Sequence, residues 1–194
     1  YAHILDLDTK FRALLSSLPI FLRPDPTLEQ LPEVRQEQAQ RPYLAMHRLI
    51  VFEAVNQRLL VLHRDDMCRG HHDEKFAYST RVAVDAARTI LSCRQQIDNV
   101  HPAVQKHAAF RHHLFQAAIV LSIHLLELSH KAQGESQVAH QLRDDIALIM
   151  NYLYGSNNLR TSLPVPQKIA LKLIEMLLAE AHERQNLSLI HISD

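Results

Sequence analysis

The chain has 194 residues, enough for one domain whose core needs no disulfide or metal ion. Hydrophobic residues make up 47% of it, glycine occurs three times and tryptophan is absent, which favours an all-α fold over a turn-rich β fold. Lysine plus arginine equal aspartate plus glutamate at 21 each, so the overall charge does not attract nucleic acid or an anionic membrane. The sequence also has no apolar span of membrane length.

Hydrophobic periodicity predicts about six helices. Apolar residues at steps of three and four predict the first helix over residues 4–18, a pattern that already runs at the start of the chain. Prolines then predict a long loop over residues 19–41 with at most one short helical turn. A second helix is expected from Pro42 to about Arg64. Its apolar face is predicted to lie opposite a polar face of Arg48, Glu53, Asn56 and Gln57.

The second half of the chain is predicted to hold four further helices. Ser79 is a plausible N-cap for a helix whose apolar stripe consists of Val82, Ala86, Ile90, Cys93 and Ile97. The next helix follows Pro102, and its second half, "FQAAIVLSIHLLEL" over residues 115–128, is apolar nearly all round. This segment is predicted to be the central, most buried element. Two more helices are expected after Gly134 and from about Pro166.

The stretch "LLVLHRDDMCRGHHDEKFAYST", over residues 59–80, concentrates histidine, cysteine and carboxylates between two predicted helices. Four side chains offer zinc donors: His63, Cys68, His71 and His72. They lie in one continuous loop, without the second close pair of ligands that a structural zinc site commonly has. We therefore interpret the stretch as an exposed helix connection and expect His71 and His72 to be dispensable for folding.

A catalytic alternative remains. The dipeptide of His72 and Asp73 resembles the adjacent pair of the His-Asp phosphohydrolases, which are all-helical, metal-dependent enzymes. The resemblance implies a metal set of His47, His72, Asp73 and Asp144 or Asp145. Gly70 and the polar residues around the pair, however, place it in a loop rather than on a helix facing a cleft.

A second polar concentration lies at the start of the fourth predicted helix. His107 and Arg111 are four residues apart and share a helix face, whereas His112 and His113 diverge by roughly 100°. Two interpretations stay open, a solvated helix face or an effector or anion site that uses His107 and Arg111.

Several stretches together resemble the fungal-specific transcription factor domain, the helical middle region of fungal regulators with a zinc binuclear cluster. The order is "YAHILDLDTKFRALLSSLP", a proline-broken loop, "LLVLHR", "YSTRVAVDAARTIL" and "FQAAIVLSIHLLEL". Its most specific marks are Leu62, His63, Arg64, Ser79, Ala86 and Ala87. The sequence departs from the pattern at Asp65, where proline is frequent, and at Ala83, where cysteine is frequent, which leaves the subfamily in doubt.

The resemblance implies a nuclear, non-enzymatic regulatory segment that senses a small-molecule effector or contacts transcriptional co-regulators, and that could form a homodimer. It also implies that DNA is contacted only through a zinc-containing module that is missing here, because Cys68 and Cys93 cannot supply six ligands. No cofactor is expected in this segment itself. Arg64 is expected to be structural, binding the last-turn carbonyl groups of its helix and pairing with Asp85 or another carboxylate.

The end of the chain differs from the rest. "LSLIHI", from Leu187 to Ile192, is similar to a translation of the transposon end sequence used to build DNA sequencing libraries. We therefore expect residues 1–186 to be a regulatory domain from a longer protein and residues 187–194 to be a non-native tail. The other interpretation is a continuation of the last helix, since Leu187 and Ile190 keep a three-residue step.

Overall fold

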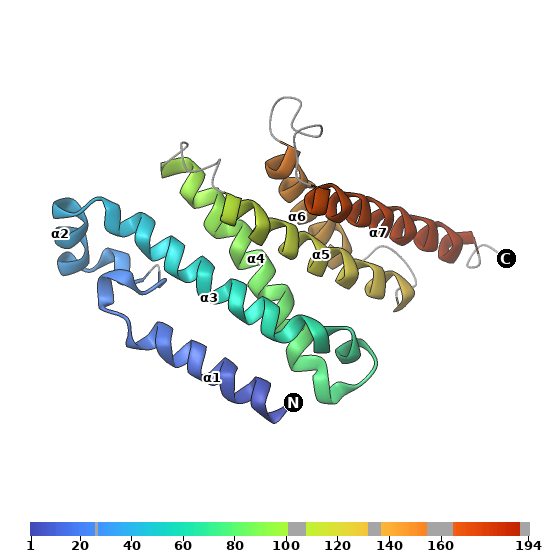
Figure 1. The fold of residues 1–194 in the computed structure, drawn as a ribbon, viewed down its shortest axis with the longest axis horizontal. Coiled ribbons are helices and arrows are strands. Elements are labelled where there is room, and N and C mark those ends of the chain that lie inside the picture. The colour runs from blue at the N-terminus through green and yellow to red at the C-terminus, as the bar shows by residue number, and fades with distance from the viewer. Residues whose placement is uncertain (26, 101–107, 132–136, 155–164, 191–194) are drawn as a thin grey trace.

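The computed structural model describes residues 1–25, 27–100, 108–131, 137–154 and 165–190. Over these residues the chain forms seven α-helices and no strand, so the predicted all-α fold is confirmed (Figure 1). The helices are α1 (Ala2–Ser17), α2 (Pro32–Gln40), α3 (Tyr43–Met67), α4 (Ala77–Val100), α5 (Ala108–Lys131), α6 (Gln137–Tyr154) and α7 (Val165–Ile190). Among the described helices none is long and apolar enough to cross a membrane.

The helices pack as a layered array. α3 and α4 run against each other along much of their length, α1 lies beside α3, and α5 packs on the other side of α4 (Figure 1). α5 also contacts α3, α6 and α7, so helices surround it on several sides. Leu114, Ala118, Leu121 and Leu125 on α5 are at most 1% exposed. The prediction that the apolar helix would be the central element is thereby confirmed.

The close packing of α4 follows from the size of its side chains. Val82, Ala86, Ile90, Cys93 and Ile97, the predicted stripe, are all buried. Ala83 and Ala87 beside them have no exposed surface. Small side chains let the backbone of α3 approach α4 closely, so that both sides of the stripe lose contact with water.

The segment predicted as a long loop over residues 19–41 is more ordered than its prolines indicate. Two 3₁₀ turns, η1 (Ile20–Leu22) and η2 (Leu28–Gln30), precede the nine-residue helix α2. Pro32 does not prevent this helix, because proline is tolerated in the first turn, where its missing N–H has no intrahelical partner. Glutamine, glutamate, arginine and alanine, which follow it, are good helix formers.

The connection between α3 and α4 is shorter than predicted. α3 continues past Arg64 to Met67, and two 3₁₀ turns, η3 (Arg69–His71) and η4 (Glu74–Phe76), lead directly into α4. Ser79 therefore lies inside the first turn of α4 instead of at its N-cap. The N-cap of this segment is Asp73, which precedes η4 and whose carboxylate accepts a hydrogen bond from the backbone N–H of Lys75 at 2.9 Å.

Gly70 makes this tight connection possible. A Cβ atom at this position would lie 2.2 Å from Thr80 Oγ1 and 2.5 Å from the carbonyl oxygen of Phe76. Thr80 is held in place, because its hydroxyl donates to the carbonyl oxygen of Met67 at 2.7 Å. The contact with backbone cannot be relieved by turning a side chain.

We expect Gly70→Ala to lower the free energy of unfolding by about 1 to 3 kcal/mol, the cost of forcing extra atoms into a packed site. The measurement is a urea titration followed by circular dichroism at 222 nm. An unchanged midpoint would mean that the α3–α4 connection can move away from residue 70 without loss.

The last helix includes part of the predicted tail. The helical backbone of α7 continues to Ile190, and residues 191–194 lie outside the described part of the chain. The division into a domain over residues 1–186 and a non-native tail over residues 187–194 stays a prediction.

Candidate functional site

Three buried polar side chains join α1, α3 and α4. Asp8, His63 and Ser79 are at most 3% exposed. His63 Nδ1 lies 2.9 Å from Ser79 Oγ, and His63 Nε2 lies 3.4 Å from Asp8 Oδ1. Asp8 Oδ2 also accepts hydrogen bonds from the Tyr78 hydroxyl at 2.7 Å and from Arg12 Nε at 2.9 Å. We call Asp8, Arg12, His63, Tyr78 and Ser79 the α1 network.

The α1 network resembles an acid–base–hydroxyl triad in composition, but its hydroxyl is not accessible. Ser79 has no exposed surface, and its Oγ lies 3.2 Å from the hydroxyl of Tyr1. A nucleophile must reach the atom that it attacks. Burial lowers the pKa of His63, more than the nearby Asp8 raises it, which favours the neutral imidazole. The geometry is that of a hydrogen-bonded structural network that fixes α1 to α3 and α4.

The signature residues of the family resemblance divide into two groups. His63, Ser79, Ala86 and Ala87 are buried where α3 meets α4, and Leu62 is half-buried. Arg64 differs, because it is exposed and its Nε lies 3.3 Å from Oδ1 of Asp65. The carboxylate that Arg64 meets is that of Asp65 and not that of Asp85, and the helix continues past residue 64 to Met67.

The face of α3 that was predicted to be exposed is buried. Arg48, Glu53, Asn56 and Gln57 are at most 7% exposed. α5 supplies polar partners at the same level: His113 Nδ1 lies 2.9 Å from Glu53 Oε1, and Gln57 donates to Gln116 at 2.9 Å. Burial raises the pKa of Glu53, while the hydrogen bond from His113 acts in the opposite direction. The prediction failed because polar residues on two helices meet each other instead of water.

A further charged pair lies inside α4 and was not predicted. Arg94 is 3% exposed, and its Nη2 lies 2.8 Å from Asp98 Oδ1 one turn later. The guanidinium also faces the rings of Phe110 and Tyr152, at 5.6 and 5.9 Å from their centroids. Opposite charges four residues apart beside an apolar stripe were the available signal, but on an amphipathic helix such pairs are more often exposed.

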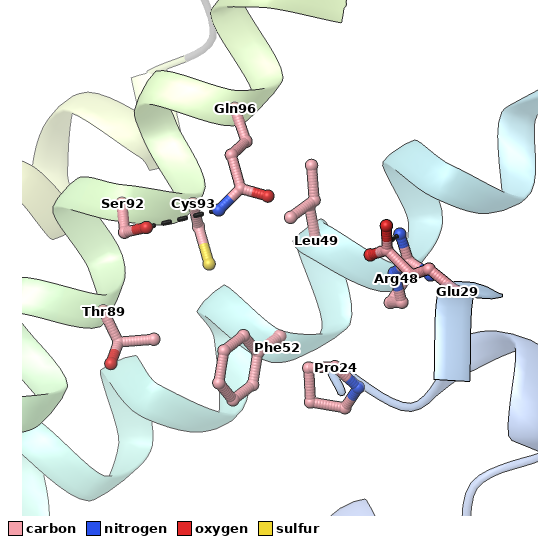
Figure 2. A pocket seen from close by; sticks show the side chains of 9 residues that line it. All are labelled: Pro24, Glu29, Arg48, Leu49, Phe52, Thr89, Ser92, Cys93 and Gln96. Atoms are coloured by element: carbon pink, nitrogen blue, oxygen red, sulfur yellow. Dashed lines mark hydrogen bonds and ion pairs between the residues drawn. The ribbon is translucent and has the colours of Figure 1, made fainter. Parts of the chain in front are cut away.

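A cavity of about 230 Å³ lies between the η1–η2 segment, α3 and α4 (Figure 2). Its lining residues are Pro24, Glu29, Arg48, Leu49, Phe52, Thr89, Ser92, Cys93 and Gln96. The Arg48–Glu29 ion pair forms one wall, with Nη2 and Oε1 2.6 Å apart. Ser92 and Gln96, which are exposed and hydrogen-bonded to each other at 3.2 Å, stand at the solvent side.

The thiol of Cys93 points into this cavity (Figure 2). Burial raises the pKa of the thiol to about 12, and the charge of nearby Glu53 adds to the shift. The sulfur is therefore protonated at neutral pH, and a protonated thiol is neither a good nucleophile nor a metal ligand. What the cavity offers is a polar wall, an apolar wall and a neutral sulfur, which suits binding rather than covalent chemistry.

The residues of the alternative metal site are used elsewhere. His47 is exposed with its ring 5.2 Å from that of Tyr43, His72 lies 3.4 Å from Glu127, and Asp73 caps η4. Asp144 is exposed on α6, and Asp145 accepts a hydrogen bond from Arg88 at 2.8 Å. No group of three or more potential metal ligands occurs among the residues that the structure describes.

The predicted effector site at the start of α5 is only partly visible. His107 lies outside the described residues, and Arg111 is half-buried on α5. His112 and His113 point in different directions, as expected from their spacing: His112 contacts Gln116 and His113 contacts Glu53. An effector site formed by His107 and Arg111 stays a prediction.

The histidines of the α3–α4 connection are not equivalent. His71 is buried, and its Nε2 lies 3.2 Å from His124 Nδ1 on α5. His72 is exposed, with 68% of its side-chain surface accessible. The prediction that both are solvated is wrong for His71, because the short connection folds back onto the core.

We expect His71→Ala to lower the free energy of unfolding by about 1 to 3 kcal/mol, because it removes a buried side chain together with its hydrogen bond to His124. His72→Ala is the matched control, for which the change should stay within about 0.5 kcal/mol. Urea titrations of both variants measure the difference. Equal effects would show that burial of His71 contributes nothing to stability.

The fold and site define a class of protein: an all-helical domain with buried polar networks, a small cavity and, among the described residues, no cluster of metal ligands. The chain is similar to fungal transcription factors. It is 26% identical over 129 residues to the probable transcription factor lepB of Aspergillus flavus, covering 64% of this chain and 22% of that protein. It is also 26% identical over 144 residues to the agnestins biosynthesis cluster transcription factor AgnL11 of Paecilomyces divaricatus, covering 73% of this chain and 19% of that protein.

The chain thus spans about a fifth of the length of the curated relatives it matches. No protein-family model matches it, and no solved structure matches it.

Proposed function

We propose that this chain is a regulatory segment of a fungal transcription factor, which senses an effector or contacts a co-regulator and catalyses no reaction. The observation that carries the proposal is the sequence similarity to two fungal transcription factors over 64% and 73% of the chain. The structure is compatible with it, because the buried polar side chains of His63, Ser79 and Glu53 join helices through hydrogen bonds. A protonated thiol and a fully buried serine offer no nucleophile.

In this proposal the segment acts in the nucleus and touches DNA only through a separate zinc-containing module of the longer protein. The formal net charge of zero supports the proposal that this segment does not itself bind DNA, because non-specific DNA affinity depends on an excess of positive charge. Transcriptional co-regulators or a small molecule are the proposed partners, and a homodimer is compatible with the role.

A reporter experiment tests the proposal. Residues 1–186, fused to a bacterial DNA-binding module, should change transcription of a reporter with the matching operator in a fungal host, relative to the DNA-binding module alone. The isolated chain should not shift a DNA fragment in a gel at micromolar concentration. Unchanged transcription, with the fusion present in equal amount by immunoblot, would contradict the regulatory role. DNA binding by the isolated chain would contradict the proposal that only the separate zinc-containing module contacts DNA.

A further inference from the structure

Arg48 has an unusual environment for an arginine. Only 9% of its side-chain surface is exposed, and the anion that balances its charge is Glu29. A guanidinium removed from water requires such a partner, because an unpaired buried charge is strongly unfavourable. The position beside the Arg48 guanidinium therefore has to be occupied by an anion.

Glu29, the anion that pairs with Arg48, is less enclosed than Arg48 itself. The side chain of Glu29 is 43% exposed. It lies in η2, a 3₁₀ turn of three residues between two proline-containing stretches. Its Oε1 lies 2.6 Å from Arg48 Nη2, and a guanidinium carries five N–H donors. A carboxylate from solution could engage the same group in a two-pronged geometry, which is the stronger arrangement.

The opposite part of the cavity is apolar. Leu49 and Phe52 on α3, Pro24 and the neutral thiol of Cys93 surround it (Figure 2). Thr89, Ser92 and Gln96 on α4 add hydroxyl and amide groups toward solvent. At about 230 Å³ the space lies below the roughly 300 to 1,000 Å³ of pockets for drug-sized ligands, so it suits a molecule of about one ring.

We propose that this cavity binds a small aromatic or alicyclic carboxylic acid, whose carboxylate replaces Glu29 on Arg48 while its ring lies against Leu49, Phe52 and Pro24. Glu29 is then an internal competitor that occupies the anion position when no ligand is bound. Because ligand and Glu29 exclude each other, binding releases η2 from α3. The effector class rests on the proposed regulatory function, whereas binding itself can be measured without transcription.

Benzoate is the probe, because it combines one carboxylate with one planar ring, and benzamide is its neutral counterpart. In calorimetric titrations of the whole chain, benzoate should bind and benzamide should not. Glu29→Gln removes the internal competitor and should tighten benzoate binding by about tenfold or more, since the competent state is then more populated. Asp6→Asn is the matched control, because Asp6 on α1 forms an exposed ion pair with Lys10 at 2.7 Å and does not line the cavity. Its affinity for benzoate should equal that of the original chain.

Two variants test the site itself. Arg48→Met should abolish benzoate binding. Ser92→Phe should also abolish it by filling the solvent side of the cavity without touching the ion pair, which keeps the test valid if Arg48→Met fails to fold. Equal binding of benzoate and benzamide, an unchanged affinity in Glu29→Gln, or benzoate binding that survives Ser92→Phe would each overturn the proposal. If benzoate does not bind but the reporter fusion is active, the proposed effector site is contradicted and the proposed regulatory function is not. If benzoate binds but the reporter fusion is inactive, the regulatory function is contradicted and the binding site is not.

Discussion

Leu121→Ala is expected to lower the free energy of unfolding by about 2 to 5 kcal/mol, through lost burial and the cavity left behind. Leu121 has no exposed surface and lies in the middle of α5, which is packed against α4, α6 and α7. Helices on several sides restrict how far the surroundings can collapse into the space, which places the cost toward the upper part of the range.

Leu14→Ala is the matched control for this prediction. It is the same chemical change on α1, at a side chain that is 50% exposed. The expected change there is within about 0.5 kcal/mol, as at ordinary surface positions. Urea titrations of both variants, with an unchanged slope, provide the comparison. A loss at Leu121 no larger than that at Leu14 would mean that α5 is not the centre of the core.

The position of α5 could be predicted because the signal was local. A segment apolar nearly all round can be satisfied only by burial on every side, whatever the rest of the chain does. The buried stripe of α4 could be predicted equally well, because its apolar residues recur at the helical period with polar residues between them. Such patterns determine which face is buried without reference to any partner.

The polar face of α3 could not be predicted in the same way. Glu53 and Gln57 look like solvent-facing residues until His113 and Gln116, about 60 positions later, are placed opposite them. A polar residue is buried at acceptable cost only if it finds a hydrogen-bonding partner, and that partner is set by tertiary packing. The error in α2 had another origin, namely giving prolines more weight than the helix formers between them.

The candidate site escaped prediction for the same reason. The cavity joins Glu29 from a proline-rich segment to Arg48 on α3 and Cys93 on α4. No spacing in the sequence relates these residues. Cys93 was correctly predicted to lie in the core, but that prediction did not indicate that its thiol borders an open space.

Asp8→Asn is expected to lower the free energy of unfolding by about 1.5 to 3 kcal/mol, the contribution of hydrogen bonds to a charged group. Asp8 is 3% exposed and is the one carboxylate in the α1 network. Its negatively charged carboxylate accepts hydrogen bonds from both Arg12 and the Tyr78 hydroxyl. Asparagine keeps the shape but removes the charge. Without it, α1 loses its main polar attachment to α3 and α4.

The pH dependence of stability separates this charge effect from a simple loss of packing. Burial raises the pKa of Asp8. The hydrogen bonds from Arg12 and Tyr78 and the charges of Arg12 and His63 together lower it by more, so the net pKa lies below its ordinary value. The stabilisation is therefore complete above the pKa of an unfolded aspartate, about 3.9, and is lost as the pH falls through the lower folded value. The original chain and Asp8→Asn should differ most near neutral pH and converge under acid. Asp6→Asn, two residues earlier on the same helix and in an exposed ion pair, should differ little from the original chain near neutral pH. A difference between Asp8→Asn and the original chain that stays constant as the pH is lowered would show that the Asp8 carboxylate acts through packing alone.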